Sequence, residues 1–76
     1  MKGEFSVCQF FQDGTYDYER RFVSAEDAVR IWRHLTSSVG AQLGTTQRVI
    51  ITDGGDCINM EWEYGKGQTY PRHTGS

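Results

Sequence analysis

The sequence predicts a two-layer α+β domain, in which a four-stranded antiparallel sheet carries one helix on one face in the order ββαββ. Three features lead to this prediction. Apolar residues recur at helical spacing only within residues 24–43, an alternating segment with an Asp-Gly turn precedes this stretch, and a second such segment follows it. At 76 residues the chain is near the lower size limit of a stable domain. We therefore expect residues 1–64 to form a single domain.

The first predicted hairpin joins residues 4–11 to residues 15–22. Asp13-Gly14 favours a two-residue type I′ turn, in which both turn residues need a positive φ. This turn pairs Phe11 with Tyr16, Gln9 with Tyr18, Val7 with Arg20 and Phe5 with Phe22. The register gathers most large apolar side chains on the inner face of the sheet and leaves Cys8, Phe10 and Arg21 on the outer face.

The predicted helix spans about residues 24–43. Ser24 and Asp27 have the spacing of an N-terminal capping box. The apolar side of the helix comprises Ala28, Ile31, Trp32, Leu35, Val39 and Leu43. Gly40 and Gly44 could each end the helix. We place the end at Gly44, because Val39 and Leu43 stay in phase with the apolar side.

The second predicted hairpin joins residues 47–52 to residues 57–64 around Gly54-Gly55. It pairs Ile51 with Ile58, Val49 with Met60 and Gln47 with Trp62 on the inner face, and Arg48 with Glu61 on the outer face. Two strand orders, 2-1-3-4 and 1-2-4-3, remain open. Residues 65–76 have no periodicity and contain three glycines and a proline. We expect them to form a flexible tail, whose last two residues are typical of a cloning remnant.

The helix start Ser24-Ala25-Glu26-Asp27-Ala28 and the turn Asp53-Gly54 are similar to those of a group of small bacterial domains. Over residues 5–64 the chain resembles these uncharacterised bacterial ββαββ domains of unknown function. The resemblance implies the fold, and it implies no activity, cofactor or site residue.

Few residues offer catalytic or metal chemistry. The chain has two cysteines, Cys8 and Cys57, and two histidines, His34 and His73, without the close ligand spacing of a zinc site. Both cysteines are expected on the outer face, whereas His34 lies on the helix beyond the inner face, so we expect no Cys/His pair and no enzyme. We likewise expect no cofactor and no metal. No segment is apolar enough to span a membrane, so a cytoplasmic location is expected.

The outer sheet face is the best candidate for function. The residues predicted to form an interaction surface there are Cys8, Phe10, Arg21, Arg48, Ile50, Cys57 and Asn59. The leading hypothesis is a protein-interaction module that forms a homodimer, or binds another protein, through this face or through an edge strand. Single-stranded nucleic-acid binding is the alternative, but 8 basic against 10 acidic residues argue against it. Small-ligand binding or catalysis ranks third, because one helix on four strands rarely provides a pocket.

Overall fold

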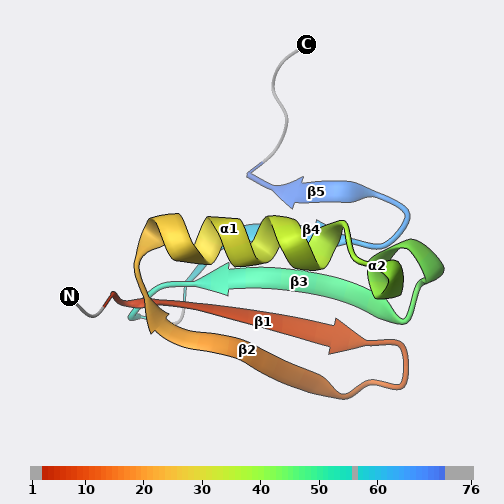
Figure 1. The fold of residues 1–76 in the computed structure, drawn as a ribbon, viewed down its shortest axis with the longest axis horizontal. Helices are drawn as coiled ribbons and strands as arrows, with labels where there is room; N and C mark the ends of the chain where they lie inside the picture. The colour runs from red at the N-terminus through yellow and green to blue at the C-terminus, as the bar shows by residue number, and fades with distance from the viewer. Residues whose placement is uncertain (1–2, 56, 72–76) are drawn as a thin grey trace, which may run out of the picture.

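The computed structural model describes residues 3–55 and 57–71. In these ranges the chain forms a five-stranded antiparallel sheet in the order β2-β1-β3-β4-β5. The strands are β1 (Phe5–Phe11), β2 (Tyr16–Val23), β3 (Thr46–Thr52), β4 (Ile58–Glu63) and β5 (Gly67–Tyr70), and the helices are α1 (Ala25–Thr36) and α2 (Val39–Leu43). Figure 1 shows α1 crossing one face of the sheet, with β2 and β5 at the opposite edges. The α+β class is confirmed, and the first four strands follow the order 2-1-3-4.

The core lies between α1 and the middle of the sheet. Its buried residues are Val7, Val49 and Ile51 from β1 and β3 and Ala28, Trp32 and Leu35 from α1. The Trp32 indole N–H also donates a hydrogen bond to the carbonyl oxygen of Val49, at 3.2 Å. Burial and this bond together fix α1 over β3. The predicted inner face is therefore confirmed at these strand positions.

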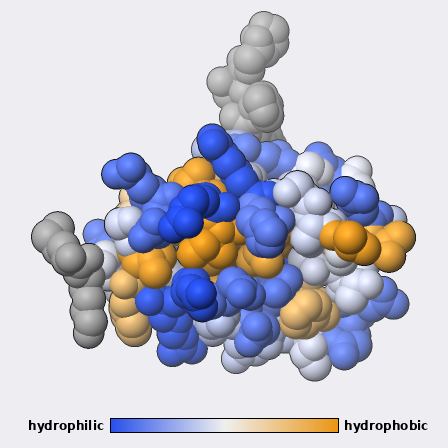
Figure 2. All heavy atoms as spheres, viewed as in Figure 1, coloured by the Kyte–Doolittle hydropathy of each residue, from blue (hydrophilic) through white to orange (hydrophobic). Residues whose placement is uncertain are grey.

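The helical segment consists of two helices, where one was expected. Ser24 caps α1 as predicted, since its hydroxyl accepts from the backbone N–H of Asp27 at 3.1 Å. The helix then stops, because Ser38 caps a second helix by accepting from the Ala41 N–H at 3.2 Å. The change of direction takes Val39 and Leu43 out of the core. The two residues are 69% and 72% exposed. Figure 2 shows apolar side chains gathered at the right-hand end, where Figure 1 places α2.

α2 ends at Gly44, the residue where the single predicted helix was expected to end, whereas α1 already ends at Thr36. Gly44 has a φ of 87°, the left-handed conformation that glycine adopts without strain. A Cβ at this position would lie 3.1 Å from the Tyr64 ring. The glycine therefore lets the chain turn and also allows β4 to end close to α2.

The first hairpin has a three-residue loop, and this changes its register. The N–H of Phe11 donates to the Thr15 carbonyl at 2.8 Å, and the N–H of Gly14 donates to the Phe11 carbonyl at 3.0 Å. Gly14 has a φ of 89°, whereas Asp13 does not have a positive φ. Such a loop is a type I turn followed by a bulge at glycine. The predicted two-residue turn is wrong, because Asp13 instead accepts hydrogen bonds from the N–H and hydroxyl of Thr15.

The new register moves two tyrosines to the other face of the sheet. Phe10 pairs with Tyr16 and Cys8 pairs with Tyr18, where the sequence suggested Phe11 and Gln9 as their partners. Two irregularities in β2 then restore the predicted pairing of Val7 with Arg20 and shift Phe5 onto Val23. Phe22, the expected partner of Phe5, lies in this bulged region with a φ of 58° and is 59% exposed.

The second hairpin is displaced by two residues, so its faces are kept. Val49 pairs with Trp62 and Ile51 with Met60, whereas the predicted partners were Met60 and Ile58. The N–H of Asp53 donates to the Cys57 carbonyl at 3.0 Å, so the loop is one residue longer than a two-residue turn on Gly54-Gly55. A register irregularity between Ile51 and Thr52 adds the second residue of the displacement. Ile58 is consequently opposite Thr52 and 37% exposed, outside the core.

A fifth strand occupies residues that were expected to be a flexible tail. The Lys66 N–H donates to the Glu63 carbonyl at 3.0 Å and closes a tight turn, in which Gly65 has a φ of 83°. β5 then pairs with β4 through Gly67, Gln68 and Tyr70. These residues show no apolar alternation, because β5 is an edge strand whose side chains remain half-buried or exposed. The remaining tail residues, 72–76, lie outside the described residues.

Trp32→Phe tests the bond that fixes α1 on β3. Loss of the indole donor leaves the Val49 carbonyl without this partner and reduces core packing, so we expect the free energy of unfolding to fall by about 2–3 kcal/mol. Urea denaturation followed by circular dichroism measures this change. Trp62→Phe is the control, because Trp62 is only partly buried, and we expect a loss of about 1 kcal/mol. Equal losses in the two variants would contradict this assignment.

The two Asp-Gly loops predict a pH dependence of stability. Hydrogen bonds from Thr15 hold the pKa of Asp13 below its usual 3.8, and those from the Gly55 N–H, Asn59 and the Cys57 N–H do the same for Asp53. Because these pKa values are lower in the folded state, the unfolded state binds more protons, and stability falls as the pH drops from about 4 toward the folded pKa values. We expect Asp53→Asn to keep the turn and to flatten this fall, as measured by urea denaturation at successive pH values. Asp17→Asn is the control for the loss of a negative charge, and an unchanged slope in Asp53→Asn would contradict the prediction.

Candidate interaction surface

The outer face of the sheet carries its side chains in two cross-strand rows. The first row runs Tyr18, Cys8, Ile50, Glu61 and Tyr70 from β2 to β5. The second row runs Tyr16, Phe10, Arg48, Glu63 and Gly67. Both helices pack on the opposite face, so in the described residues no second layer covers these rows. The face therefore has an aromatic side on β2 and β1 and an acidic side on β4.

Aromatic rings and guanidinium groups form a continuous chain on this face. The ring centroids of Phe10 and Tyr16 are 5.8 Å apart, and those of Tyr16 and Tyr18 are 6.1 Å apart in an edge-to-face arrangement. The Arg21 guanidinium lies 4.1 Å from the Tyr18 centroid, and that of Arg48 lies 5.2 Å from the Phe10 centroid. Both distances are within the range of cation–π attraction. We call these five residues the aromatic–arginine patch.

Tyr16 lies at the middle of the aromatic–arginine patch and is its most accessible ring. The residue is 61% exposed, compared with 37% for Tyr18. It contacts the rings of both Phe10 and Tyr18, which hold its position from either side. A ring that is ordered by neighbours and still exposed can contact a partner with little loss of conformational entropy.

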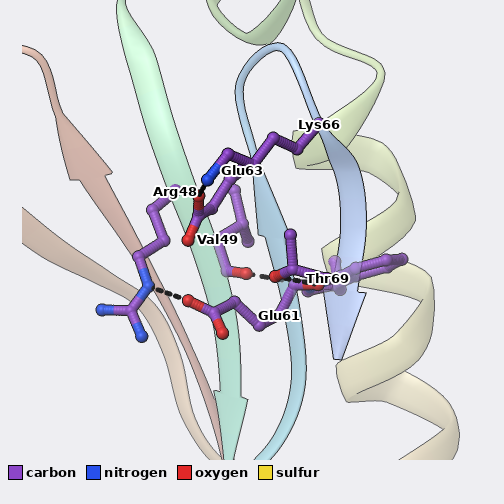
Figure 3. A network of polar contacts seen from close by, with 7 residues as sticks. Arg48, Val49, Glu61, Glu63, Lys66 and Thr69 are labelled. Atoms are coloured by element: carbon purple, nitrogen blue, oxygen red, sulfur yellow. Dashed lines mark hydrogen bonds and ion pairs between the residues drawn. The ribbon is translucent and has the colours of Figure 1, made fainter. Parts of the chain in front are cut away.

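An ion pair between β3 and β4 covers the apolar centre of the face. The Nε of Arg48 contacts a carboxylate oxygen of Glu61, and Figure 3 shows this contact reaching diagonally from one strand to the next. Glu61 is opposite Ile50, and Arg48 precedes Ile50 by two residues in β3, so all three side chains are on the outer face. Ile50 is consequently only 7% exposed. Figure 3 also shows Lys66 beside Glu63, at 3.3 Å, and Thr69 bonded to the Glu61 carbonyl.

Only some of the residues predicted from the sequence for this surface lie in the aromatic–arginine patch. Phe10, Arg21 and Arg48 lie together in the aromatic–arginine patch. Cys8 and Ile50 are on the outer face as predicted, but they are 2% and 7% exposed and are not available for contact. Cys57 lies directly before β4, at the loop of the second hairpin. Asn59 lies at a bulge in β4, and its side-chain amide donates to the Cys57 carbonyl. These last two are exposed but do not belong to the patch.

Tyr16 and Tyr18 belong to the outer face but were not among the residues predicted for it. Both were assigned to the inner face, because Asp13-Gly14 was interpreted as a two-residue turn. Thr15 is the signal that could have identified the longer loop. A Thr two residues after an Asp can donate twice to its carboxylate, which stabilises a loop in which only the glycine needs a positive φ.

The described groups considered for catalysis come from separate parts of the fold. Burial raises the pKa of the Cys8 thiol, so this thiol stays protonated and is a poor nucleophile. Cys57 lies at a hairpin end and His34 on α1, on the other side of the sheet from Cys8, while His73 is outside the described residues. Within residues 3–55 and 57–71, no three His, Cys, Asp or Glu side chains are grouped so as to hold a metal ion.

Comparison with known proteins found no matching family model, no matching curated protein and no matching solved structure. The resemblance to small bacterial ββαββ domains thus stays an expectation from the sequence. Neither helix of the described chain has the length and apolar character needed to cross a membrane. The geometry of the outer face is therefore the basis for the functional proposal.

Arg48→Met tests whether the Arg48–Glu61 pair stabilises the sheet. The Glu61 side chain is only 17% exposed, so removal of its cation leaves a largely buried carboxylate unpaired. We expect a loss of about 1–3 kcal/mol in the free energy of unfolding, measured by urea denaturation. Lys66→Met removes a pair whose lysine is 70% exposed, and we expect a loss below about 0.5 kcal/mol. A larger effect in Lys66→Met than in Arg48→Met would contradict this account.

Proposed function

We propose that this chain is a protein-interaction domain that forms a homodimer through the outer face of its sheet. The observation that carries the proposal is the aromatic–arginine patch around Tyr16 on a face that the helices leave open. Tyrosine, phenylalanine and arginine are enriched at protein interfaces, and tyrosine and arginine dominate binding energy there. We also propose that the protein is cytoplasmic and is not an enzyme.

The two edge strands are less suited to association than the face. β2 departs twice from regular pairing with β1 and carries four charged residues, Asp17, Glu19, Arg20 and Arg21. Bulges and charges of this kind prevent the addition of a further strand. β5 has only four residues and is followed directly by Pro71. A proline cannot donate a ladder hydrogen bond, so this edge is also short and blocked.

The charge distribution supports a second copy as the partner. Arg21 lies on the β2 side of the outer face and forms no ion pair within the part of the chain that the structure describes. Glu61 and Glu63 lie on the β4 side, where each also contacts a cation of its own chain. A twofold axis parallel to the strands places the β2 side of one copy over the β4 side of the other. Each Arg21 then approaches the acidic side of its partner, and the contact is made twice.

Single-stranded nucleic-acid binding is the second candidate, and the position of the tyrosines favours it. Tyr16 and Tyr18 are on the open face with Phe10, as base stacking would require. However, the guanidinium groups of Arg21 and Arg48 already cover the rings of Tyr18 and Phe10. The net charge of −2 and the carboxylates of β4 also oppose a phosphate backbone. These observations favour the protein partner.

Tyr16→Ala tests the proposed dimer. We expect the unmodified chain to show the mass of a dimer in size-exclusion chromatography with light scattering. The variant loses the central exposed ring, so its dissociation constant should rise by roughly 10-fold to 100-fold. Circular dichroism should show the same fold in both proteins.

Leu43→Ala is the matched control, because Leu43 is apolar and 72% exposed but lies on α2, away from the outer face. Its dissociation constant should be unchanged. A chain that stays monomeric at millimolar concentration would overturn the proposed dimer. If that monomer bound a labelled single-stranded oligonucleotide at low salt, and Tyr16→Ala abolished the binding, the second candidate would replace the first.

A further inference from the structure

A cavity of about 310 Å³ lies on the helix side of the molecule, between α1 and β2. It is lined by Glu19, Arg20, Arg30, Ile31, His34 and Leu35. Its volume is at the lower end of the range for small-molecule sites. One helix on four strands rarely provides a pocket, so small-ligand binding ranked third among the functions expected from the sequence, and this cavity gives that class a candidate site.

The lining residues come together because of the register of β2 and the period of α1. Arg20 is opposite Val7 and therefore on the inner face, but β2 is an edge strand and the guanidinium reaches solvent at the rim. Ile31, His34 and Leu35 have the spacing that places side chains along one flank of a helix. This flank faces Arg20 across the cavity.

The lining carries two guanidinium groups and one carboxylate, although the chain as a whole is acidic. Arg20 donates to the backbone carbonyl of Glu19 at 3.3 Å and makes no ion pair among the residues that the structure describes. Arg30 contributes a second guanidinium, which Asp27 neutralises in part at 2.5 Å. The Glu19 carboxylate is the one acidic group of the lining. Arg20 is thus a bidentate donor without an anionic partner.

Two aliphatic side chains form the apolar part of the cavity lining. Leu35 is 8% exposed and belongs to the core, and Ile31 packs partly against the same core. A ligand that entered here would place its head group at Arg20 and His34 on the rim and its body on the two aliphatic side chains. Arginine forms two parallel hydrogen bonds with a carboxylate, and an apolar body gains free energy by leaving water.

We propose that this cavity binds a small organic anion with a carboxylate head and an aliphatic body. Arg20 binds the carboxylate, His34 contributes a further donor at the rim, and Ile31 and Leu35 contact the aliphatic body. The site faces the helix side, and the aromatic–arginine patch lies on the other side of the sheet. Binding at this site therefore does not depend on the proposed dimer.

A titration of the ¹⁵N-labelled full chain with sodium octanoate, followed by amide chemical shifts, tests this site. We expect saturable shifts at Arg20, Ile31, His34 and Leu35. Octylammonium has the same aliphatic body and the opposite charge, so it should produce no saturable shift at these amides. Inorganic phosphate lacks the aliphatic body, so it should bind at least roughly 10-fold more weakly than octanoate, which corresponds to about 1.4 kcal/mol.

Arg20→Gln should weaken octanoate binding by at least roughly 10-fold, and His34→Gln should weaken it to a smaller extent. Arg33→Gln is the matched control, because Arg33 is an exposed arginine of α1 that does not line this cavity. Its affinity should equal that of the unmodified chain. Equal binding of octanoate and octylammonium, no saturation, or unchanged affinity in Arg20→Gln would overturn the proposal, provided that dispersed amide signals show the variant is folded. Phosphate binding as tight as that of octanoate would show that the aliphatic part of the proposal is wrong.

Discussion

One backbone constraint decides which side chains of β2 face away from the helices. In the loop between β1 and β2 only Gly14 has a positive φ, and the loop therefore closes between Phe11 and Thr15. Because side chains alternate along a strand, a closure one residue earlier or later would reverse the faces of Tyr16 and Tyr18. The aromatic–arginine patch exists because of this closure. A surface feature on one face thus depends on hydrogen bonds made at the end of the hairpin.

The main parts of the fold follow from the sequence because several independent signals agree. The cap at Ser24, the apolar period through Trp32 and Leu35, and the inward positions of Val7, Val49 and Ile51 all reflect burial between one helix and one sheet. A shift of two residues in the second hairpin left these faces unchanged, since it preserves the alternation. For these positions the amphipathic pattern was sufficient.

The differences arise where short-range hydrogen bonds compete with that pattern. Ser38 bonds the N–H of Ala41 and starts a new helix, although Val39 and Leu43 continue the apolar period of α1. Asp13 bonds Thr15 and lengthens a loop by one residue. β5 buries little apolar surface, so its composition gives no strand signal. The candidate surface was therefore found only in part, with Phe10, Arg21 and Arg48 identified and the two tyrosines assigned to the wrong face.

The outer face also shows how an uncovered sheet can keep apolar side chains out of water without a second layer. Cys8 and Ile50 are nearly inaccessible in the isolated chain. Their neighbours are long side chains, among them Arg48, whose guanidinium contacts both Glu61 and the ring of Phe10. The small core on the helix side is thus complemented by a thin layer of aromatic and aliphatic groups on the other side.

The order of the strands implies a gradient of local stability across the sheet. β1 and β3 each have a strand on both sides and lie beneath α1, whereas β5 is held along one side by β4 alone. Separation of β5 from β4 would break a few ladder bonds and leave the cluster of Val7, Trp32 and Val49 intact. Transient opening should therefore begin at the C-terminal edge and exchange backbone amides there first, while the central strands open only when the whole domain unfolds.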